Sequence, residues 1–285
     1  MATTAHTLHV DDVGEVSVTV SEHGAAGHPV LLLHGGGGPR TVTPWAARLA
    51  GSRPAHVLAP VHPGFDGTQR PDRLTSVAGL AGTYVALLDA LDLHGVTVVG
   101  NSIGGWVAAE MAVLASPRVT GYVLVDAVGI EVPGHPVADF FALTPAEVAR
   151  LSYADPARYG IDPATLPPEV LAVMPGNRAA LEVYGGRAMT DPSLARRLAE
   201  VTTATLVVWG EADRIGDPTF GRAYAEAIPG ARFTLLEGVG HLPQIEAPDA
   251  LVEHVWAFAA AHADSAGHDG STPGPSPHAE RRPTV

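Results

Sequence analysis

Short apolar runs alternate with longer amphipathic segments along most of this 285-residue chain. The runs are rich in β-branched residues and are bounded by Gly or Pro, which is typical of buried strands. They fall at residues 16–20, 30–33, 56–58, 96–99, 121–125, 206–209 and 233–236. Between most of them lie segments with apolar residues at helical spacing, at residues 74–93, 106–114, 220–228 and 251–261. The alternation predicts an α/β fold with a mostly parallel central sheet and helices on both faces.

Two parts of the chain do not follow this alternation of predicted strands and helices. Residues 131–197 are rich in Pro, contain short helical patterns and show no clear strand. We interpret them as a helical cap inserted into a single core that is formed by residues 1–130 and 198–263. Residues 264–285 are dominated by Gly, Pro, Ser and other polar residues, which cannot bury enough apolar surface to offset chain entropy. This tail is therefore predicted to be disordered.

The composition excludes several classes of protein. The formal net charge is -13 and no run of basic residues could follow a phosphate backbone, so no nucleic-acid partner is expected. The chain has no cysteine, which excludes a thiol nucleophile and thiolate metal ligands. No apolar stretch reaches the ~20 residues of a membrane span, and the N-terminus carries no signal pattern. We therefore expect a cytoplasmic protein without a membrane partner.

The strongest local signal is a candidate nucleophile. Residues 96–105 read VTVVGNSIGG, an apolar run that leads directly into G-x-S-x-G and then into a predicted helix. In a nucleophile elbow the serine sits at such a sharp turn, at the carboxyl end of a strand. Gly100 and Gly104 let the strand and the helix approach without a Cβ clash. Ser102 is therefore the candidate nucleophile.

A serine hydroxyl needs an adjacent base, which is most often histidine. His241 lies in residues 237–243, EGVGHLP, directly after the last apolar run. Loops at the carboxyl ends of parallel strands converge at one edge of the sheet. We therefore predict that His241 is the general base.

That histidine needs a carboxylate to fix its tautomer and to stabilise its charged form. Residues 205–214 read TLVVWGEADR, so Asp213 follows another apolar run. Glu211 in the same segment and Asp126 after an earlier run are its rivals. Asp213 is favoured because Ser, Asp, His is the chain order associated with a nucleophile elbow. Asp126 would otherwise hydrogen-bond a neighbouring loop.

The developing oxyanion needs two backbone N–H groups. Ile103, immediately after the nucleophile, offers the first. Residues 33–39 read LHGGGGP after an early apolar run, and the glycines let bare backbone face a substrate. We choose Gly36 as the second donor, with Gly35 close behind, and expect His34 to brace this loop by hydrogen bonding.

Taken together, these motifs resemble those of the α/β-hydrolase superfamily. They are LHGGGG at 33–38, VHPGFDG at 61–67, GNSIGG at 100–105, WGEADR at 209–214 and GHLP at 240–243. The resemblance covers about residues 7–263 and implies the α/β-hydrolase fold. It assigns the nucleophile, acid, base and oxyanion amides to Ser102, Asp213, His241, Ile103 and Gly36. A serine at the elbow separates the chain from haloalkane dehalogenases and epoxide hydrolases, which carry aspartate there.

The glycine loop and the elbow also resemble those of meta-cleavage-product hydrolases, which cleave carbon–carbon bonds in vinylogous diketones. Asn101 matches a polar position beside the nucleophile in that group. Those enzymes tend to carry Trp just after the catalytic histidine, where this chain has Leu242 and Ile245. We therefore favour a carboxylic ester as the substrate, cleaved through an acyl-enzyme on Ser102, and keep C–C bond hydrolysis as the alternative.

A small-molecule-binding protein, or a biosynthetic lyase or cyclase on the same fold, is the alternative from another class. The hydrolase interpretation requires a small-molecule substrate but no cofactor and no metal, and the sequence is compatible with a homodimer. We expect the cap to select the substrate. Its arginines, Arg150, Arg158, Arg178 and Arg187, either contact an acidic substrate or face solvent.

Overall fold

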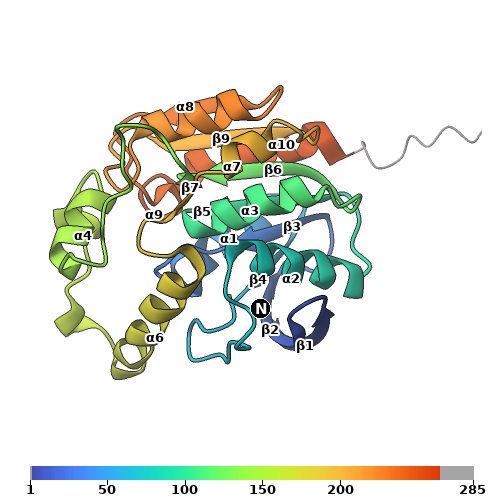
Figure 1. Cartoon of the computed structure of the whole chain (residues 1–285), viewed down its shortest axis with the longest axis horizontal. Coiled ribbons are helices and arrows are strands. Elements are labelled where there is room, and N and C mark those ends of the chain that lie inside the picture. The colour runs from blue at the N-terminus through green and yellow to red at the C-terminus, as the bar shows by residue number, and fades with distance from the viewer. Residues whose placement is uncertain (1, 264–285) are drawn as a thin grey trace, which may run out of the picture.

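The computed structural model describes residues 2–263, in which a twisted central sheet carries helices on both faces (Figure 1). Within these residues the main sheet has eight strands. In spatial order they are β1 (Ala2–Val10), β2 (Gly14–His23), β4 (Ala55–Pro60), β3 (His28–Leu33), β5 (Val96–Asn101), β6 (Val119–Val125), β9 (Thr205–Gly210) and β10 (Arg232–Leu236). The β1–β2 and β2–β4 pairs are antiparallel and the others are parallel, which confirms the predicted sheet. The tail predicted to be disordered, residues 264–285, lies outside the described residues.

Different helices cover the two faces because successive residues of a strand point to opposite sides. In β3, Leu31 and Leu33 join an apolar cluster with α2, α3 and α8, whereas Val30 and Leu32 join one with α1 and α10. Full burial of each such side chain contributes ~1.5–3 kcal/mol. The bounds are α1 (Thr43–Ser52), α2 (Val77–Ala90), α3 (Ile103–Leu114), α8 (Pro218–Ala227) and α10 (Pro248–His262).

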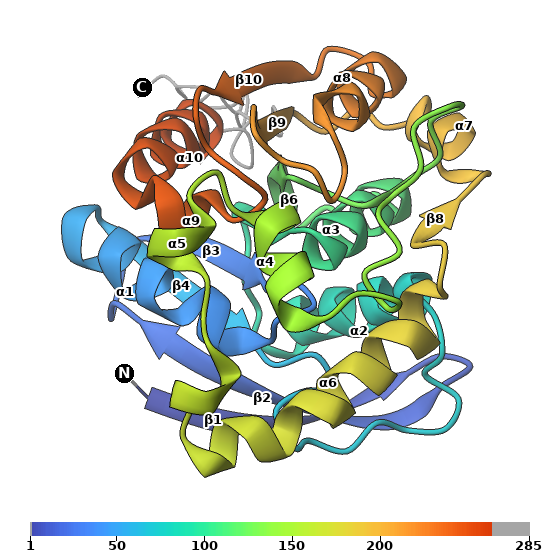
Figure 2. The same ribbon diagram turned by 90° about the vertical axis from the view of Figure 1, so that its left-hand side faces the viewer.

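The predicted cap segment, residues 131–197, follows β7 (Gly129–Ile130) and lies across the end of the sheet at which the parallel strands finish. Figure 2 looks onto this end, with α4, α5 and α6 in front of the core. The segment comprises α4 (Pro145–Ser152), α5 (Pro156–Tyr159), the short 3-10 helix η2 (Pro163–Thr165), α6 (Pro168–Gly185), β8 (Thr190–Asp191) and most of α7 (Leu194–Leu198).

The cap segment differs from the sequence-based prediction in two details. It contains a strand, because β8 pairs in parallel with β7. Its predicted end at residue 197 falls inside α7, which packs against α3 and α8 of the core. Arg197 of α7 forms ion pairs with Glu110 of α3 and with Asp191. The chain has therefore returned to the core before residue 197.

Helix α6, with 18 residues, lies against the core through its C-terminal half. It buries Asn177, Ala180, Leu181 and Tyr184 there, while Met174, nearer its N-terminus, is 39% exposed. No helix in the described part of the chain is both long and apolar enough to cross a membrane.

Candidate active site

Ser102 sits at a strained turn between β5 and α3. Its φ of 57° and ψ of -119° lie outside the regions that most residues adopt. A Cβ on Gly100 would fall 2.1 Å from the Gly104 carbonyl oxygen, and a Cβ on Gly104 would fall 2.3 Å from the Leu33 carbonyl oxygen. Because only glycine allows such close backbone packing, the turn has the geometry predicted for a nucleophile elbow.

His241 and Asp213 form a buried hydrogen-bonded pair. Nδ1 of His241 lies 2.8 Å from Oδ2 of Asp213, and the two side chains are only 7% and 0% exposed. The N–H groups of Ile215 and Gly216 donate to the other Asp213 oxygen at 2.8 and 3.3 Å. With these donors around the carboxylate, Nδ1 carries the imidazole proton, and Nε2 of His241 is left as the basic nitrogen.

Asn101 joins the elbow to the histidine loop. Its Nδ2 donates to the backbone carbonyl oxygens of His241 at 3.0 Å and of Val125 at 3.2 Å. Its Oδ1 accepts from Nε2 of Gln244 at 3.0 Å. The residue that precedes Ser102 therefore fixes the backbone of His241. Sequence reasoning marked Asn101 as a supporting residue but did not identify Gln244 as its partner.

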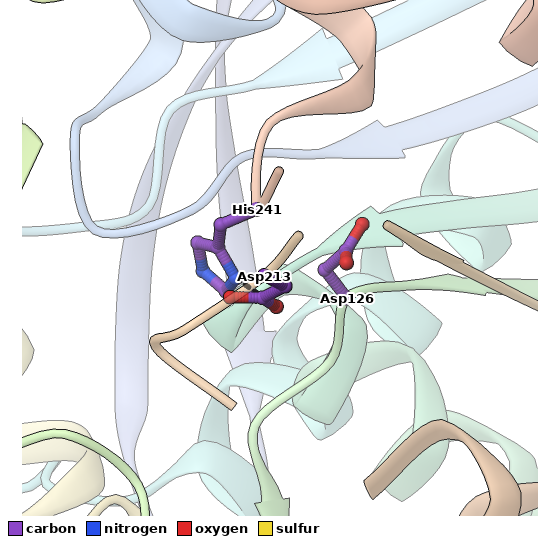
Figure 3. A group of neighbouring side chains, drawn as sticks. All are labelled: Asp126, Asp213 and His241. Atoms are coloured by element: carbon purple, nitrogen blue, oxygen red, sulfur yellow. Dashed lines mark hydrogen bonds and ion pairs between the residues drawn. The ribbon is translucent and has the colours of Figure 1, made fainter. Parts of the chain in front are cut away.

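Of the three carboxylates considered as the histidine's partner, Asp213 is the one that the structure brings to His241. Figure 3 shows Asp213 against the imidazole ring and Asp126 beyond it. Oδ1 of Asp126 accepts the Gly210 N–H at 2.8 Å, which is the loop-bracing role considered for it. Glu211 is exposed and accepts the Gly238 N–H at 3.0 Å.

The surroundings of Asp126 favour the neutral form of its carboxyl group. Burial, reinforced by the nearby charge of Asp213, raises the pKa of Asp126 well above its ordinary value. Asp126, Asp213 and His241 each offer a ligand atom within 4.8 Å of the others, as a metal site would. A metal there would have to displace the Asp213–His241 hydrogen bond and bind the charged form of Asp126, which burial disfavours. We therefore interpret the group as an acid–base site.

The glycine loop after β3 lies between the elbow and the cap. A Cβ on Gly35 would be 3.2 Å from Cβ of Ser102, and a Cβ on Gly36 would be 2.6 Å from Cδ2 of Leu181 in α6. Ile103 is the first residue of α3, so no carbonyl of a preceding helical turn accepts its N–H. The structure thus places Gly35 next to Ser102 and Gly36 next to Leu181 of α6.

Two buried histidines brace this glycine loop. His34 contacts the Gly35 carbonyl oxygen through Nδ1 and accepts the His62 N–H at Nε2, at 2.8 and 3.0 Å. His62 contacts the His34 carbonyl oxygen through Nε2 and the Tyr84 hydroxyl through Nδ1, at 2.9 and 2.5 Å. Burial lowers the pKa of His62 to about 4, and burial with the adjacent His62 lowers the pKa of His34 well below its ordinary value. Both lowered pKa values favour neutral rings, which brace the loop through these hydrogen bonds. This bracing role was predicted for His34 but not for His62.

The cap arginines differ in what they contact. Arg178 and Arg187 lie over the ring of Phe141, and Arg158 lies over the ring of Tyr159. Arg178 also donates to the Phe141 carbonyl oxygen. Arg150 instead borders a hollow of about 460 Å³ between α4, α5 and residues 160–162. The residues that line this hollow do not include Ser102, Asp213 or His241.

Comparison with known proteins gives the same fold and family. Lipase 1 of Psychrobacter immobilis is 29% identical over 259 residues, which cover 86% of this chain and 81% of the lipase. A 2-hydroxy-6-oxo-2,4-heptadienoate hydrolase of Pseudomonas putida is 30% identical over 266 residues, which cover 83% of this chain and 90% of that enzyme. The structure of a thermophilic esterase from Thermogutta terrifontis superposes with a TM-score of 0.73 at 22% identity, over 91% of this chain and 99% of the esterase. The model of the alpha/beta hydrolase family matches residues 30–254. This chain therefore belongs to the alpha/beta hydrolase family.

Proposed function

We propose that this hydrolase cleaves a small-molecule carboxylic ester through an acyl-enzyme on Ser102. The observation that carries the proposal is the pairing of a strained serine turn with a buried Asp213–His241 hydrogen bond. Asn101 holds the two together, because it precedes the serine and binds the His241 carbonyl oxygen. A nucleophile, a base and an acid that orients the base are the groups that acyl transfer requires.

In the proposed reaction, Nε2 of His241 takes the hydroxyl proton as Oγ of Ser102 bonds to the ester carbonyl carbon. The N–H groups of Ile103 and Gly36 stabilise the oxyanion, and Asp213 stabilises the imidazolium. When the C–O bond breaks, the leaving alkoxide takes the proton from His241 and departs as an alcohol. Water, activated by the same nitrogen, then attacks the acyl-enzyme, releases the acid and restores Ser102.

Hydrolysis of a C–C bond is the second candidate, favoured by the 30% identity to the heptadienoate hydrolase. In that chemistry the leaving group is a carbanion, whose charge must be held by polar or cationic groups near the pocket. Arg158, Arg178 and Arg187 lie over aromatic rings, and Arg150 borders a hollow that is not lined by Ser102 or His241. An ester demands less of this cap, because His241 protonates the leaving alkoxide directly.

The two candidates are separated by steady-state turnover of p-nitrophenyl acetate or butyrate against a 2-hydroxy-6-oxo-dienoate. Each substrate is measured with the wild type and with Ser102→Ala. We expect ester turnover that Ser102→Ala abolishes. A dienoate kcat/KM ~100-fold above that of every ester tried would make C–C hydrolysis the function.

A further inference from the structure

Glu246 joins the cap to the loop that carries the candidate base. It is the last residue of α9 (Pro243–Glu246) and is partly buried. One carboxylate oxygen accepts the N–H of Gly240, the residue before His241, at 2.5 Å. The other accepts the N–H of Ala154, just beyond α4, at 2.9 Å. A single carboxylate therefore binds both the loop of His241 and the segment just beyond α4, where Ala154 lies 92 residues from Glu246 in the chain.

The two segments also contact each other directly. The N–H of His241 donates to the Ser152 carbonyl oxygen at 2.7 Å. A Cβ on Gly240 would fall 2.3 Å from that same oxygen, so the cap backbone lies directly on the histidine loop. The loop that carries Asp213 also contacts the end of α4, because the N–H of Arg214 donates to the Leu151 carbonyl oxygen at 3.1 Å. The end of α4 thus binds the loops of both Asp213 and His241.

We propose that Glu246 is a positioning residue, whose carboxylate couples the placement of the cap at residues 152–154 to the orientation of His241. Hydrogen bonds to an ionised carboxylate are stronger than neutral ones, and two of them act on one side chain here. Loss of the carboxylate leaves two amide donors without their partner. A cap displaced from its place would carry the His241 backbone with it through Ser152 and Glu246.

The variant Glu246→Gln tests this coupling with little change in shape. A glutamine side chain has one acceptor oxygen and an NH₂ group, so it can bind one of the two amides but not both. Glu211→Gln is the matched control, because Glu211 accepts the Gly238 N–H from the same loop and has no part in the proposed catalytic site. The first measurement is hydrogen exchange of the free enzyme in peptides that cover residues 151–155 and 239–242.

We expect Glu246→Gln to accelerate exchange in both peptides together, whereas Glu211→Gln leaves residues 151–155 unchanged. The second measurement rests on the proposed ester hydrolysis. Because a misplaced base slows the chemical step, kcat should fall ~10- to 100-fold in Glu246→Gln with KM within about threefold of the wild type. A purely structural role would lower the melting temperature and leave kcat unchanged where the variant is folded.

Ala154→Pro provides a second variant, which keeps Glu246 but removes the cap donor and places the proline ring where the Glu246 carboxylate binds. Tyr153, with φ -113° and ψ 142°, already has the extended conformation that a residue before proline adopts. Ala154→Pro should therefore accelerate hydrogen exchange at residues 239–242. Unchanged hydrogen exchange at residues 239–242 in both variants would overturn the proposal. A kcat of Glu246→Gln equal to that of Glu211→Gln would also overturn it. If every ester fails as a substrate but exchange in the two segments still changes together, the coupling stands and the proposed function falls.

Discussion

The carboxyl groups of Asp126 and Asp213 are both buried and lie within 4.8 Å of each other, but only that of Asp213 is hydrogen-bonded to His241. Two carboxylates so close in a buried site do not both ionise readily. Asp213 receives hydrogen bonds from Ile215 and Gly216 as well as from the imidazole. Asp126 receives one, from Gly210, and burial raises the pKa of Asp126. The two carboxyl groups therefore have different roles: Asp213 binds the imidazole, and Asp126 binds the backbone.

This division predicts unequal effects of two conservative substitutions. Asp213→Asn should lower kcat by ~10³-fold or more, because the carboxamide cannot hold the imidazole tautomer or stabilise the imidazolium. Asp126→Asn should lower kcat less than ~10-fold, because burial already favours the neutral form of Asp126 and the amide oxygen can still accept the Gly210 N–H. Steady-state kinetics of both variants, with melting curves to show that each is folded, make the comparison. A larger loss at Asp126 would move the catalytic acid to the end of β6.

The neutral histidine pair predicts that the protein is less stable in mild acid. Burial lowers the pKa of His62 from 6.5 to about 4, so the unfolded chain binds a proton more tightly than the folded protein does. The free energy of unfolding should therefore be highest above pH 6.5 and fall as the pH drops towards 4, by about 3 kcal/mol from this group. Urea unfolding at pH 7 and pH 4.5 measures the fall. His62→Gln lowers stability at pH 7 but should flatten the dependence, and an equal slope in both proteins would rule His62 out as its source.

The contact between the glycine loop and the cap predicts a suppressor pair. In Gly36→Ala the added Cβ would lie 2.6 Å from Cδ2 of Leu181, so either the loop or α6 must move. We expect kcat to fall ~10- to 100-fold, because the proposed oxyanion donor, the Gly36 N–H, is displaced. Leu181→Ala removes the clashing atoms, so the double variant should recover part of the lost kcat. If the kcat of the double variant equals the value obtained by multiplying the effects of the two single substitutions, the clash with Leu181 is not the cause of the lower kcat in Gly36→Ala.

A local pattern and the sheet topology were sufficient to predict one contact of the candidate site. Ser102, Asp213 and His241 each follow an apolar run, and parallel strands bring the ends of such runs to one edge, so the Asp213–His241 contact could be expected. β1 was not predicted because Ala2–Val10 is an edge strand whose many Thr and His residues are largely exposed. The short helix α1 (Thr43–Ser52) was also not predicted.

The supporting contacts could not be read from the sequence, because they join distant segments. Glu246 binds Ala154, 92 residues away, and Asn101 binds Gln244, 143 residues away. No spacing rule links such positions before the cap and the loops are placed. His62 lies in the VHPGFDG motif at residues 61–67, which the sequence singled out. Its contact with Tyr84, however, depends on how α2 packs against the sheet.

The most direct test of the central claim is labelling by a fluorophosphonate probe, followed by peptide mass spectrometry. A serine that is activated by His241 should form a covalent adduct on the peptide that contains Ser102. Ser102→Ala should abolish that adduct and lower ester turnover by ~10³-fold or more, while the melting temperature stays close to that of the wild type. An adduct on another residue, or labelling and turnover that persist in Ser102→Ala, would contradict the assignment of Ser102 as the nucleophile.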